Sequence, residues 1–539
     1  MLTALRSISI LFGDWSCSEG LPGYFVTMVA LIRICIYSIF VPNGDREVMN
    51  VKTREADSTI SLSNTMKNRA YLLDACILLV TCGLLFLGAS WQIFQVYTDV
   101  AKYQCYAVAF WRGTSALQSF PAHQCDNILH PDPTIPILTN TSLAEKLLRH
   151  GFPQPLVQFV MSQSPTAPFH ALPREYPFLN IFPFSLALLA PFHWYQVAYA
   201  FCMAVVAISI YLALVRFRSR RAAIAFALYL VTGCWGTALG RFDLIPSALT
   251  LFAVICAVRK QWNWAFMWLA WGTLFKFYPA ILLLPFLLAQ QMETYKSGTG
   301  WFAWRRWQPL GVFAALCIVV MGSSVLLSAG GTIDQIRYFG DRPVQVESFS
   351  ASLIWLASLI THHTLAFGKT FGSLNILNVP SLASKVSLLG TAMLGAGLLY
   401  TYWLQWRGKI GLALASLLTL LIVMVTGKVF SPQYLIWVAP LVAYVGETDW
   451  RWLVPWTMLS LLTTWIYPNI YVMTPRLSDV PLLPLFFPVT TVRNFLLFGF
   501  ILALLFYGTR KKSMAASPDV LPDPVAPQAT VIQNSSAQG

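Results

Sequence analysis

The sequence predicts an all-α fold, a polytopic transmembrane helical bundle with about 12 spans and a long first outward loop. Three observations predict this fold class. Of the 539 residues, 57% are hydrophobic and 11% are charged, whereas soluble domains carry roughly 25% charged residues. Apolar runs near the roughly 20-residue spanning length recur between Tyr71 and Tyr507. Short loops that hold many of the Arg and Lys residues separate these runs, as is typical of multi-pass membrane proteins.

Three segments are expected along the chain. Residues 1–70 form an N-terminal extension, and its apolar stretch 24–41 is either an extra span, an interfacial helix or the product of a start codon assigned too early. Residues 71–509 form one transmembrane domain with its first outward loop at 95–178. Residues 510–539 are rich in Pro, Ala, Ser and Gln and predict a disordered cytoplasmic tail.

The predicted spans each combine an apolar run with a polar boundary. They cover residues 71–94, 194–215, 222–239, 242–258, 262–275, 279–292, 306–328, 383–404, 410–427, 433–448, 450–468 and 490–509. With these spans, the basic clusters all fall on one side, which is therefore cytoplasmic. These clusters lie at 216–221, 259–260, 305–306, 407–409 and 510–512. The apolar pieces 178–191 and 352–367 break the alternation, so we expect half-depth or surface helices there on the outward side.

Composition and motifs also exclude several function classes. The net charge of +14 comes from basic clusters beside apolar runs, which act as topology signals rather than as a nucleic-acid surface. The ten cysteines are scattered singly, so neither a zinc site nor a disulfide framework is expected. The sequence contains no P-loop, Rossmann fingerprint or H-E-x-x-H motif, and hence no sign of direct nucleotide or zinc chemistry.

Polar groups at the predicted outward ends of the spans are the functional candidates, because ionisable residues there have no topological role. The six groups run from Tyr97 to Tyr103, Arg174 to Pro177, Gly240 to Asp243, Lys276 to Pro279, Arg342 to Ser348 and Lys428 to Tyr434. Their carboxylates suit deprotonation of a hydroxyl, and their cations suit a phosphate or pyrophosphate headgroup. A lipid-phosphate substrate fits both kinds of group.

Each group also has a simpler interpretation. Arg241 and Asp243 could form a structural ion pair that joins helix ends. Lys276 and Lys428 could be interfacial lysines whose stems lie along apolar surface. Asp99 could cap a loop helix. One outward-facing site is the interpretation that accounts for all six groups together.

At these same residues the sequence resembles the polyprenol-phosphate-sugar-dependent glycosyltransferases of the GT-C fold, and most closely the bacterial membrane mannosyltransferases of glycosyltransferase family 87. The resemblance covers roughly residues 71–509. The matching pieces occur in the same order: Asp99-Val100-x-x-Tyr103-x-x-Tyr106-Ala107 with Gly113, Glu175-Tyr176-Pro177, Arg241-Phe242-Asp243-Leu244-Ile245-Pro246, Lys276-Phe277-Tyr278-Pro279, Arg342 to Ser348 and Lys428 to Tyr434. Two departures bear on acceptor recognition. Phe178 stands where the family pattern tends to have a second proline, and the segment 113–174 is unusually long.

The resemblance implies a role for each site residue. Asp99 corresponds to the general base, and configuration inverts by direct displacement at the anomeric carbon of a polyprenyl-phosphate sugar. The substrate-binding residues that it implies are Tyr103, Glu175, Tyr176, Arg241, Asp243, Lys276, Tyr278, Arg342, Gln345, Glu347, Lys428, Gln433 and Tyr434. No metal and no cofactor is implied beyond the donor itself.

The function expected from sequence is thus transfer of a hexose, with mannose as the leading candidate, at the outer face of the cell membrane. Its partners are membrane lipids, the polyprenyl-phosphate sugar and a glycolipid or glycan acceptor, with no nucleic acid. The alternative from another class is a secondary transporter or lipid flippase, because charges within membrane segments also mark substrate pathways. Against transport, the charges lie at the span ends and the middle of each span is nearly uncharged. An acyl or phospho transferase is a further alternative.

Overall fold

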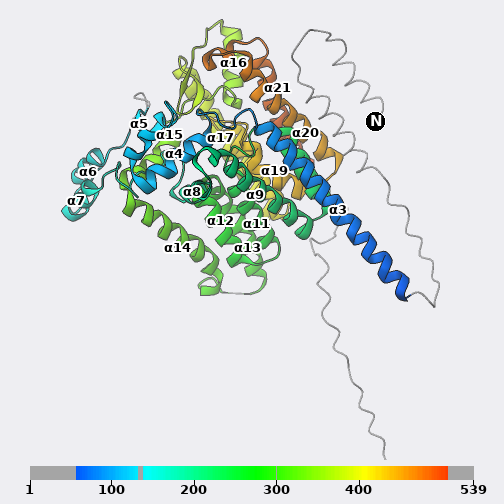
Figure 1. Cartoon of the computed structure of the whole chain (residues 1–539). Coiled ribbons are helices and arrows are strands. Elements are labelled where there is room, and N and C mark those ends of the chain that lie inside the picture. The colour runs from blue at the N-terminus through cyan, green and yellow to red at the C-terminus, as the bar shows by residue number, and fades with distance from the viewer. Residues whose placement is uncertain (1–55, 132–136, 299, 508–539) are drawn as a thin grey trace, which may run out of the picture. The chain divides into compact units, whose positions relative to one another are not determined.

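Figure 1 shows the computed structural model of the chain, which describes residues 56–131, 137–298 and 300–507. The chain divides into two compact units, Met1–Asn68 and Arg69–Gly539. The predictions for the apolar stretch 24–41 and for the tail 510–539 lie outside the described residues. The second unit carries all the candidate site residues.

The described part of the chain is mostly helical, as the sequence predicts. Five of its helical segments are long and apolar enough to cross a membrane. They are Arg69–Ala89, Phe192–Phe217, Trp304–Leu327, Pro380–Trp406 and Phe486–Phe506. The most apolar stretches of the third and fourth are only 6% and 11% buried, so their apolar surfaces suit contact with lipid rather than water.

Other apolar helices are shorter than a full crossing. Helices α11 (Leu244–Val258) and α18 (Leu412–Thr426) have 15 residues each, and α19 (Tyr434–Gly446) has 13. At 1.5 Å per residue, 15 residues extend about 22 Å, less than the roughly 30 Å of the hydrocarbon core. Residues 56–131, 137–298 and 300–507 therefore contain five helices of spanning length, and the count of about twelve spans stays a prediction.

The predicted first outward loop is folded rather than extended. After α3 (Ala56–Ala89), it contains α4, which begins at Asp99 and ends at Arg112, where Gly113 follows with a positive φ of 82°. The further elements of this region are η1 (Thr114–Ser119), α5 (Asp126–Leu129), α6 (Asn140–Arg149), α7 (Gln154–Ser162), η2 (Phe178–Asn180), α8 (Ile181–Leu186), η3 (Ala187–Leu189) and η4 (Phe192–Trp194). The apolar piece 178–191 is thus a series of short helices and not a span.

The helices that follow form the core of the second unit. They are α9 (Tyr195–Phe217), α10 (Arg220–Gly233), α11, α12 (Trp262–Phe275), η5 (Tyr278–Leu282), α13 (Leu283–Lys296) and α14 (Trp304–Leu327). Helix α12 packs between α11 and α14, and α10 packs against α9, α19 and α20 (Trp450–Thr464). The largest hydrophobic cluster runs through these helices, and alanines such as Ala222, Ala223 and Ala253 allow the backbones to approach closely.

The remaining elements complete the unit. They are α15 (Ala329–Gly340), α16 (Phe349–Thr361), β1 (Phe367–Thr370), β2 (Ser373–Ile376), α17 (Pro380–Trp406), η6 (Trp465–Ile470), η7 (Tyr471–Met473), η8 (Leu477–Leu482) and α21 (Phe486–Tyr507). Strands β1 and β2 form an antiparallel hairpin in which Phe367 pairs with Ile376. The apolar piece predicted at 352–367 is therefore mostly α16, which ends at Thr361.

The basic topology clusters and the charged candidate site residues lie in different helix connections. The cluster 216–221 joins α9 to α10, and 259–260 joins α11 to α12. Arg241 lies between α10 and α11, and Lys276 lies between α12 and η5. Because successive helices reverse direction, topology signals and candidate site residues lie at opposite ends of these helices.

Two cysteines correct the prediction that no disulfide is present. Cys105 on α4 is bonded to Cys125, 20 residues later, just before α5. Spacing gave no signal for this pair, because Cys105 and Cys125 meet only after α4 ends at Gly113 and the chain turns back. Next to the disulfide, Gln124 Nε2 donates a hydrogen bond to Gln104 Oε1 (3.0 Å). This pair of cross-links fixes α4 to the loop that follows it.

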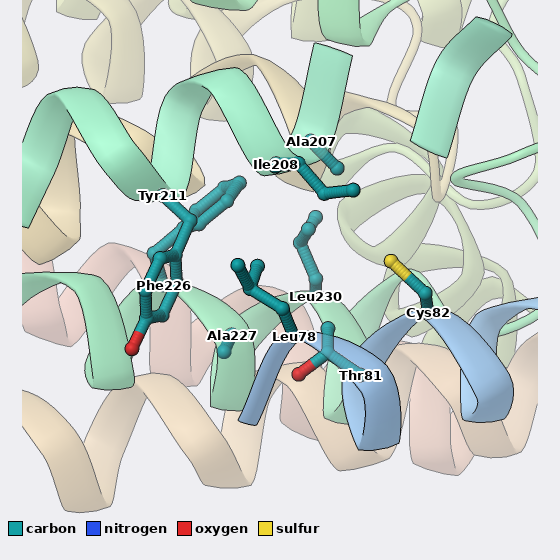
Figure 2. Close-up of a pocket in the computed structure, with 9 residues that line it drawn as sticks. All are labelled: Leu78, Thr81, Cys82, Ala207, Ile208, Tyr211, Phe226, Ala227 and Leu230. Atoms are coloured by element: carbon teal, nitrogen blue, oxygen red, sulfur yellow. The ribbon is translucent and has the colours of Figure 1, made fainter. Parts of the chain in front are cut away.

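Figure 2 shows a pocket between α3, α9 and α10. Its lining is aliphatic and aromatic apart from Thr81, Cys82 and the Tyr211 hydroxyl, which donates a hydrogen bond to Asp74 (3.0 Å). None of the residues labelled in Figure 2 is charged, and none is a candidate site residue. We therefore assign this pocket to packing between apolar helices.

Candidate functional site

The first structural feature of the site is an ion pair between Asp99 and Arg241. Thr98 caps α4 by accepting a hydrogen bond from the Ala101 amide (3.2 Å), which places Asp99 in the first turn of the helix. The carboxylate of Asp99 lies 2.5 Å from Arg241 Nη1, and the two side chains keep 17% and 25% of their surface exposed. A carboxylate at a helix N-terminus is also favoured by the helix dipole. Asp99 is thus oriented by α4 and remains accessible to a ligand.

The charges around Asp99 keep it ionised. Burial raises the pKa of Asp99, but the positive charges of Arg241, Lys102 and Lys276 lower it by more. The pKa of Asp99 therefore lies below its usual value. Lys102 Nζ is 3.8 Å from the same carboxylate. The pKa of Lys102 lies above its usual value, mainly because of the negative charge of Glu175. Burial lowers this pKa, and the negative charge of Asp99 raises it further. Both partners of this pair are therefore charged near neutral pH.

A second ion pair lies deeper and joins two successive helices. Asp243, at the start of α11, pairs with Lys276, which follows α12, and Asp243 also accepts a hydrogen bond from Trp437 Nε1 on α19. Asp243 is 1% exposed and Lys276 is 12% exposed. The ammonium of Lys276 lies 4.7 Å from the centre of the Phe242 ring and 4.8 Å from that of Trp437. This pair is built into the packing of three helices.

Lys276 is therefore paired with a carboxylate, and its expected role in substrate binding stays a prediction. The simpler interpretation that Arg241 pairs with Asp243 is wrong, because each of the two has a different partner. The physical reason is the chain direction at this turn. Arg241 precedes α11 and meets α4, whereas Asp243 begins α11 and meets the end of α12.

Aromatic rings form one wall beside these pairs. Trp437 stacks on Tyr434, with ring centroids 3.8 Å apart, and on Tyr278 at 4.3 Å. On the other side, Tyr103 stacks on Phe184 (4.1 Å) and meets the edge of Tyr176 (5.4 Å). Aromatic faces of this kind suit the apolar faces of a sugar ring or a prenyl chain as well as protein packing.

A third set of residues comes from the segment after α15. Tyr338 donates a hydrogen bond to Glu175 (3.3 Å), and the Arg342 guanidinium lies 5.6 Å from the centre of the Tyr338 ring. Arg342 Nη2 also donates to the Phe371 carbonyl (3.2 Å) and to Ser373 Oγ (3.1 Å). The cation is thus held in place by the β1–β2 hairpin rather than by a carboxylate.

Three buried polar atoms near this segment have no hydrogen-bond partner among the described residues. They are Arg342 Nε, Gln345 Oε1 and Gln433 Oε1. An unpaired buried donor or acceptor is costly unless a ligand or water satisfies it. A donor and two acceptors together match the polar groups of a sugar phosphate.

Lys428 and Glu347 lie differently from the other candidates. The Lys428 side chain is exposed, while its carbonyl accepts a hydrogen bond from the Gln345 amide (2.9 Å). Glu347 is buried against Arg493 on α21, with Nη1 to Oε2 at 3.2 Å, and accepts a hydrogen bond from the Tyr471 hydroxyl (2.7 Å). Glu347 therefore has a structural partner in Arg493, and its expected role in substrate binding stays a prediction.

The contacts join most of the candidates into one site. Electrostatic influence without a direct contact extends from Glu175 to Lys102, from Lys276 to Asp99 and from Arg342 to Tyr434. Together with the ion pairs, ring contacts and hydrogen bonds above, these interactions connect the following residues: Asp99, Lys102, Glu175, Tyr338, Arg342, Tyr434, Trp437, Asp243 and Lys276. Each of the six sequence groups thus contributes at least one residue to this set, and the group from Lys428 to Tyr434 contributes Tyr434.

Sequence reasoning missed several of these residues. Lys102 was detectable, because a residue three positions after Asp99 shares its helix face. Arg493 was detectable too, because a charge within the apolar run of α21 needs a buried partner. Tyr338 and Trp437 carried no signal, since single aromatic residues are common in apolar helices.

The described residues include no group of His, Cys, Asp and Glu that could hold a metal ion. Asn140, which begins an Asn-Thr-Ser triplet of the kind that accepts N-glycans, donates a hydrogen bond from its side-chain amide to the Gln163 carbonyl (2.6 Å). Searches against protein-family models and against curated protein sequences gave no match for this chain.

Proposed function

We propose that this chain is an integral membrane glycosyltransferase of GT-C type with about 12 spans. It moves a hexose, mannose being the first to test, from a polyprenyl-phosphate donor to a lipid or glycan acceptor on the outer face of the cell membrane. The observation that carries the proposal is the accessible Asp99–Arg241 pair, which is connected through Lys102, Glu175 and Tyr338 to the Arg342 guanidinium. Arg342, Gln345 and Gln433 each also have a buried polar atom without a partner among the described residues. A base, a phosphate-binding cation and acceptors for sugar hydroxyls then meet at one site.

The mechanism is a single displacement. Asp99 takes the proton of the acceptor hydroxyl as that oxygen forms a bond to the anomeric carbon. The bond from that carbon to the phosphate oxygen breaks, and its electron pair leaves with the polyprenyl phosphate. Arg241 and Arg342 stabilise the negative charge on the departing phosphate. Configuration at the anomeric carbon inverts, and the proton on Asp99 passes to water.

A buried ion pair and an aromatic stack beside Asp99 and Arg241 also support this assignment. The Asp243–Lys276 pair holds the start of α11 and the end of α12 together, and so fixes Arg241 two residues away. The Tyr434–Trp437–Tyr278 stack provides an apolar surface beside the charges. Such a surface can receive the first units of a prenyl chain.

The test is a transfer assay with purified protein in lipid nanodiscs. Radiolabelled polyprenyl-phosphate mannose is compared with a nucleotide-linked mannose, and a crude lipid and glycan fraction supplies the acceptor. Transfer from the lipid-linked sugar that is lost in Asp99→Asn supports the proposal. Transfer from the nucleotide sugar alone would refute it.

One observation favours the alternative of a transporter or flippase. Arg493 lies within an apolar helix and is paired with Glu347, and charges at such depth mark substrate pathways in transporters. Arg493 also donates to the Glu347 carbonyl and to Asn494 Oδ1 (2.9 Å), so its donors are engaged by the protein. Movement of a fluorescent polyprenyl phosphate across proteoliposome membranes, without any transfer of sugar, would establish the alternative.

A further inference from the structure

The charged side chains around Asp99 are balanced without a substrate. Three cations, Arg241, Lys102 and Lys276, face three carboxylates, Asp99, Glu175 and Asp243. Arg342 is a further cation of the site and is held by the β1–β2 hairpin rather than by a carboxylate. A phosphate that enters beside Asp99 competes for the cations of this balanced set, and the geometry decides which of them can move.

Lys276 is the cation least able to move. Its partner Asp243 is 1% exposed, and the ammonium lies over two aromatic rings. Withdrawing Lys276 would leave a buried carboxylate without its counter-ion, which is strongly unfavourable.

Arg241 is in the opposite situation. Its side chain is 25% exposed, and its partner Asp99 is 17% exposed and also lies 3.8 Å from Lys102. If Arg241 leaves, Asp99 keeps Lys102 beside it and still experiences the charge of Lys276. A guanidinium also binds phosphate through two parallel hydrogen bonds, which an ammonium cannot do.

We propose that Arg241 passes from Asp99 to the phosphate of the bound lipid donor, so that donor binding itself exposes the carboxylate that accepts the proton. This inference rests on the proposed function and adds an order to it. In the free protein, Arg241 occupies Oδ2 of Asp99, while Oδ1 lies 3.8 Å from Lys102. When the donor phosphate takes over Arg241, Oδ2 is released, and the base is fully available only when there is a sugar to transfer.

The electrostatics of Asp99 agree with this order. Apart from burial, Arg241 is the strongest influence on the pKa of Asp99 and holds it down. Once the guanidinium turns to phosphate, the pKa of Asp99 rises towards its usual value, and a carboxylate of higher pKa is a stronger base.

If Asp99 and the donor phosphate compete for Arg241, removing the Asp99 carboxylate should strengthen donor binding. Asp99→Asn removes the competitor, so the sugar-free polyprenyl monophosphate should bind more tightly to this variant than to wild type. We expect a gain of about tenfold in affinity, within the range typical of coupling between two sites. Binding is measured by microscale thermophoresis in nanodiscs at pH 7.5, with a melting curve for each variant.

Two controls separate competition from a general loss of negative charge. Asp126→Asn removes an exposed carboxylate in the same loop region, outside the site, and should change binding much less than Asp99→Asn. In the Arg241→Ala background, adding Asp99→Asn should give no gain, because the contested group is absent. Asp99→Ser serves as a second variant if the amide folds poorly.

The outcomes are distinguishable. Tighter binding in Asp99→Asn that disappears in the double variant supports the transfer of Arg241. Unchanged or weaker binding, or a gain that persists without Arg241, overturns the inference and leaves the proposed function standing. Wild-type protein that binds no polyprenyl phosphate overturns both.

Discussion

Arg241 and Asp243 lie two residues apart, yet each forms an ion pair with a different part of the fold. Arg241 pairs with Asp99 on α4, and Asp243 pairs with Lys276 after α12. One short turn therefore serves two purposes. It presents an accessible pair to a ligand and joins two helices through a buried pair.

Asp99→Asn should nearly abolish transfer while the protein remains folded. The amide keeps the size of the side chain but cannot accept the proton, and loss of a general base costs on the order of a hundredfold to ten-thousandfold in rate. Glu175→Gln, Asp243→Asn and Glu347→Gln should lose less rate, or lose stability as well. Turnover and a detergent melting curve are measured for all four variants. More than about a tenth of the wild-type rate in Asp99→Asn, beside a folded but inactive Glu175→Gln, would assign the base to another residue.

The Asp99–Arg241 pair should give stability a defined dependence on pH. Because the pKa of Asp99 is lowered in the folded protein, ionised Asp99 contributes stability at pH values above its unfolded pKa. That contribution is lost as pH falls through the lower folded pKa. The melting temperature of wild type should therefore exceed that of Asp99→Asn at neutral pH, with the difference shrinking in acid. A difference that grows as pH falls would contradict the ion pair.

Lys276→Ala should destabilise the protein rather than merely weaken donor use. It leaves Asp243, which is 1% exposed, without its cation, and breaking a buried pair typically costs about 3 to 5 kcal/mol. The matched control is the double variant Lys276→Met with Asp243→Asn, which removes both charges and should recover much of the loss. Melting temperatures of the three proteins are compared. A stable Lys276→Ala protein with impaired donor binding would return Lys276 to the role of phosphate ligand.

Cys105 and Cys125 should resist thiol reagents until the protein is reduced. Disulfides persist in oxidising compartments, so this bond also supports an outward position for α4. Labelling with a maleimide polymer before and after reduction, in a variant that keeps only these two cysteines, reports the bond as a shift in gel mobility. Cys105→Ser should lower stability by about 2 to 4 kcal/mol. Full labelling without reductant would place this loop on the reducing side.

Lys428→Ala should reduce donor use by about tenfold to a hundredfold if Lys428 binds phosphate, because a charge-assisted hydrogen bond contributes about 1.5 to 3 kcal/mol. Stability should stay unchanged, since the side chain is exposed. The kinetic constant for the polyprenyl-phosphate donor is measured beside that of Lys409→Ala, an exposed lysine at the opposite helix ends. Equal kinetics in the two variants would mean that Lys428 lies along the membrane interface without contacting donor.

The sequence was sufficient to predict that the charged motifs lie at one site, but not which cation pairs with which carboxylate. Asp99, Arg241 and Lys276 stood out because each is ionisable beside an apolar run, and the structure brings them together. Which cation meets which carboxylate depends on how α4 lies against the ends of α10 and α12, and sequence spacing does not contain that information. The same holds for the Cys105–Cys125 bond, which forms across a reversal of the chain after Gly113.

Helix lengths were likewise only partly predictable. Apolar runs located the helices α11, α18 and α19, but their 13 to 15 residues fall short of a full crossing. Short helices of this kind can exist in a membrane where neighbouring protein satisfies their ends. Hydropathy reports how apolar a run is, and not where a buried polar turn such as Arg241 to Asp243 interrupts it.

The contrast between the buried pair and the accessible pair has an evolutionary consequence. A change at Asp243 alone leaves Lys276 as an unmatched charge among aromatic rings, and the reverse change is equally harmful. In homologous chains these two positions should therefore vary as a unit, with both charges kept or both replaced by uncharged residues. Under the proposed function, positions 99 and 241 should show no such freedom, because a paired replacement cannot restore a general base and a phosphate-binding cation. An alignment would then separate the two ion pairs by their pattern of variation before any protein is purified.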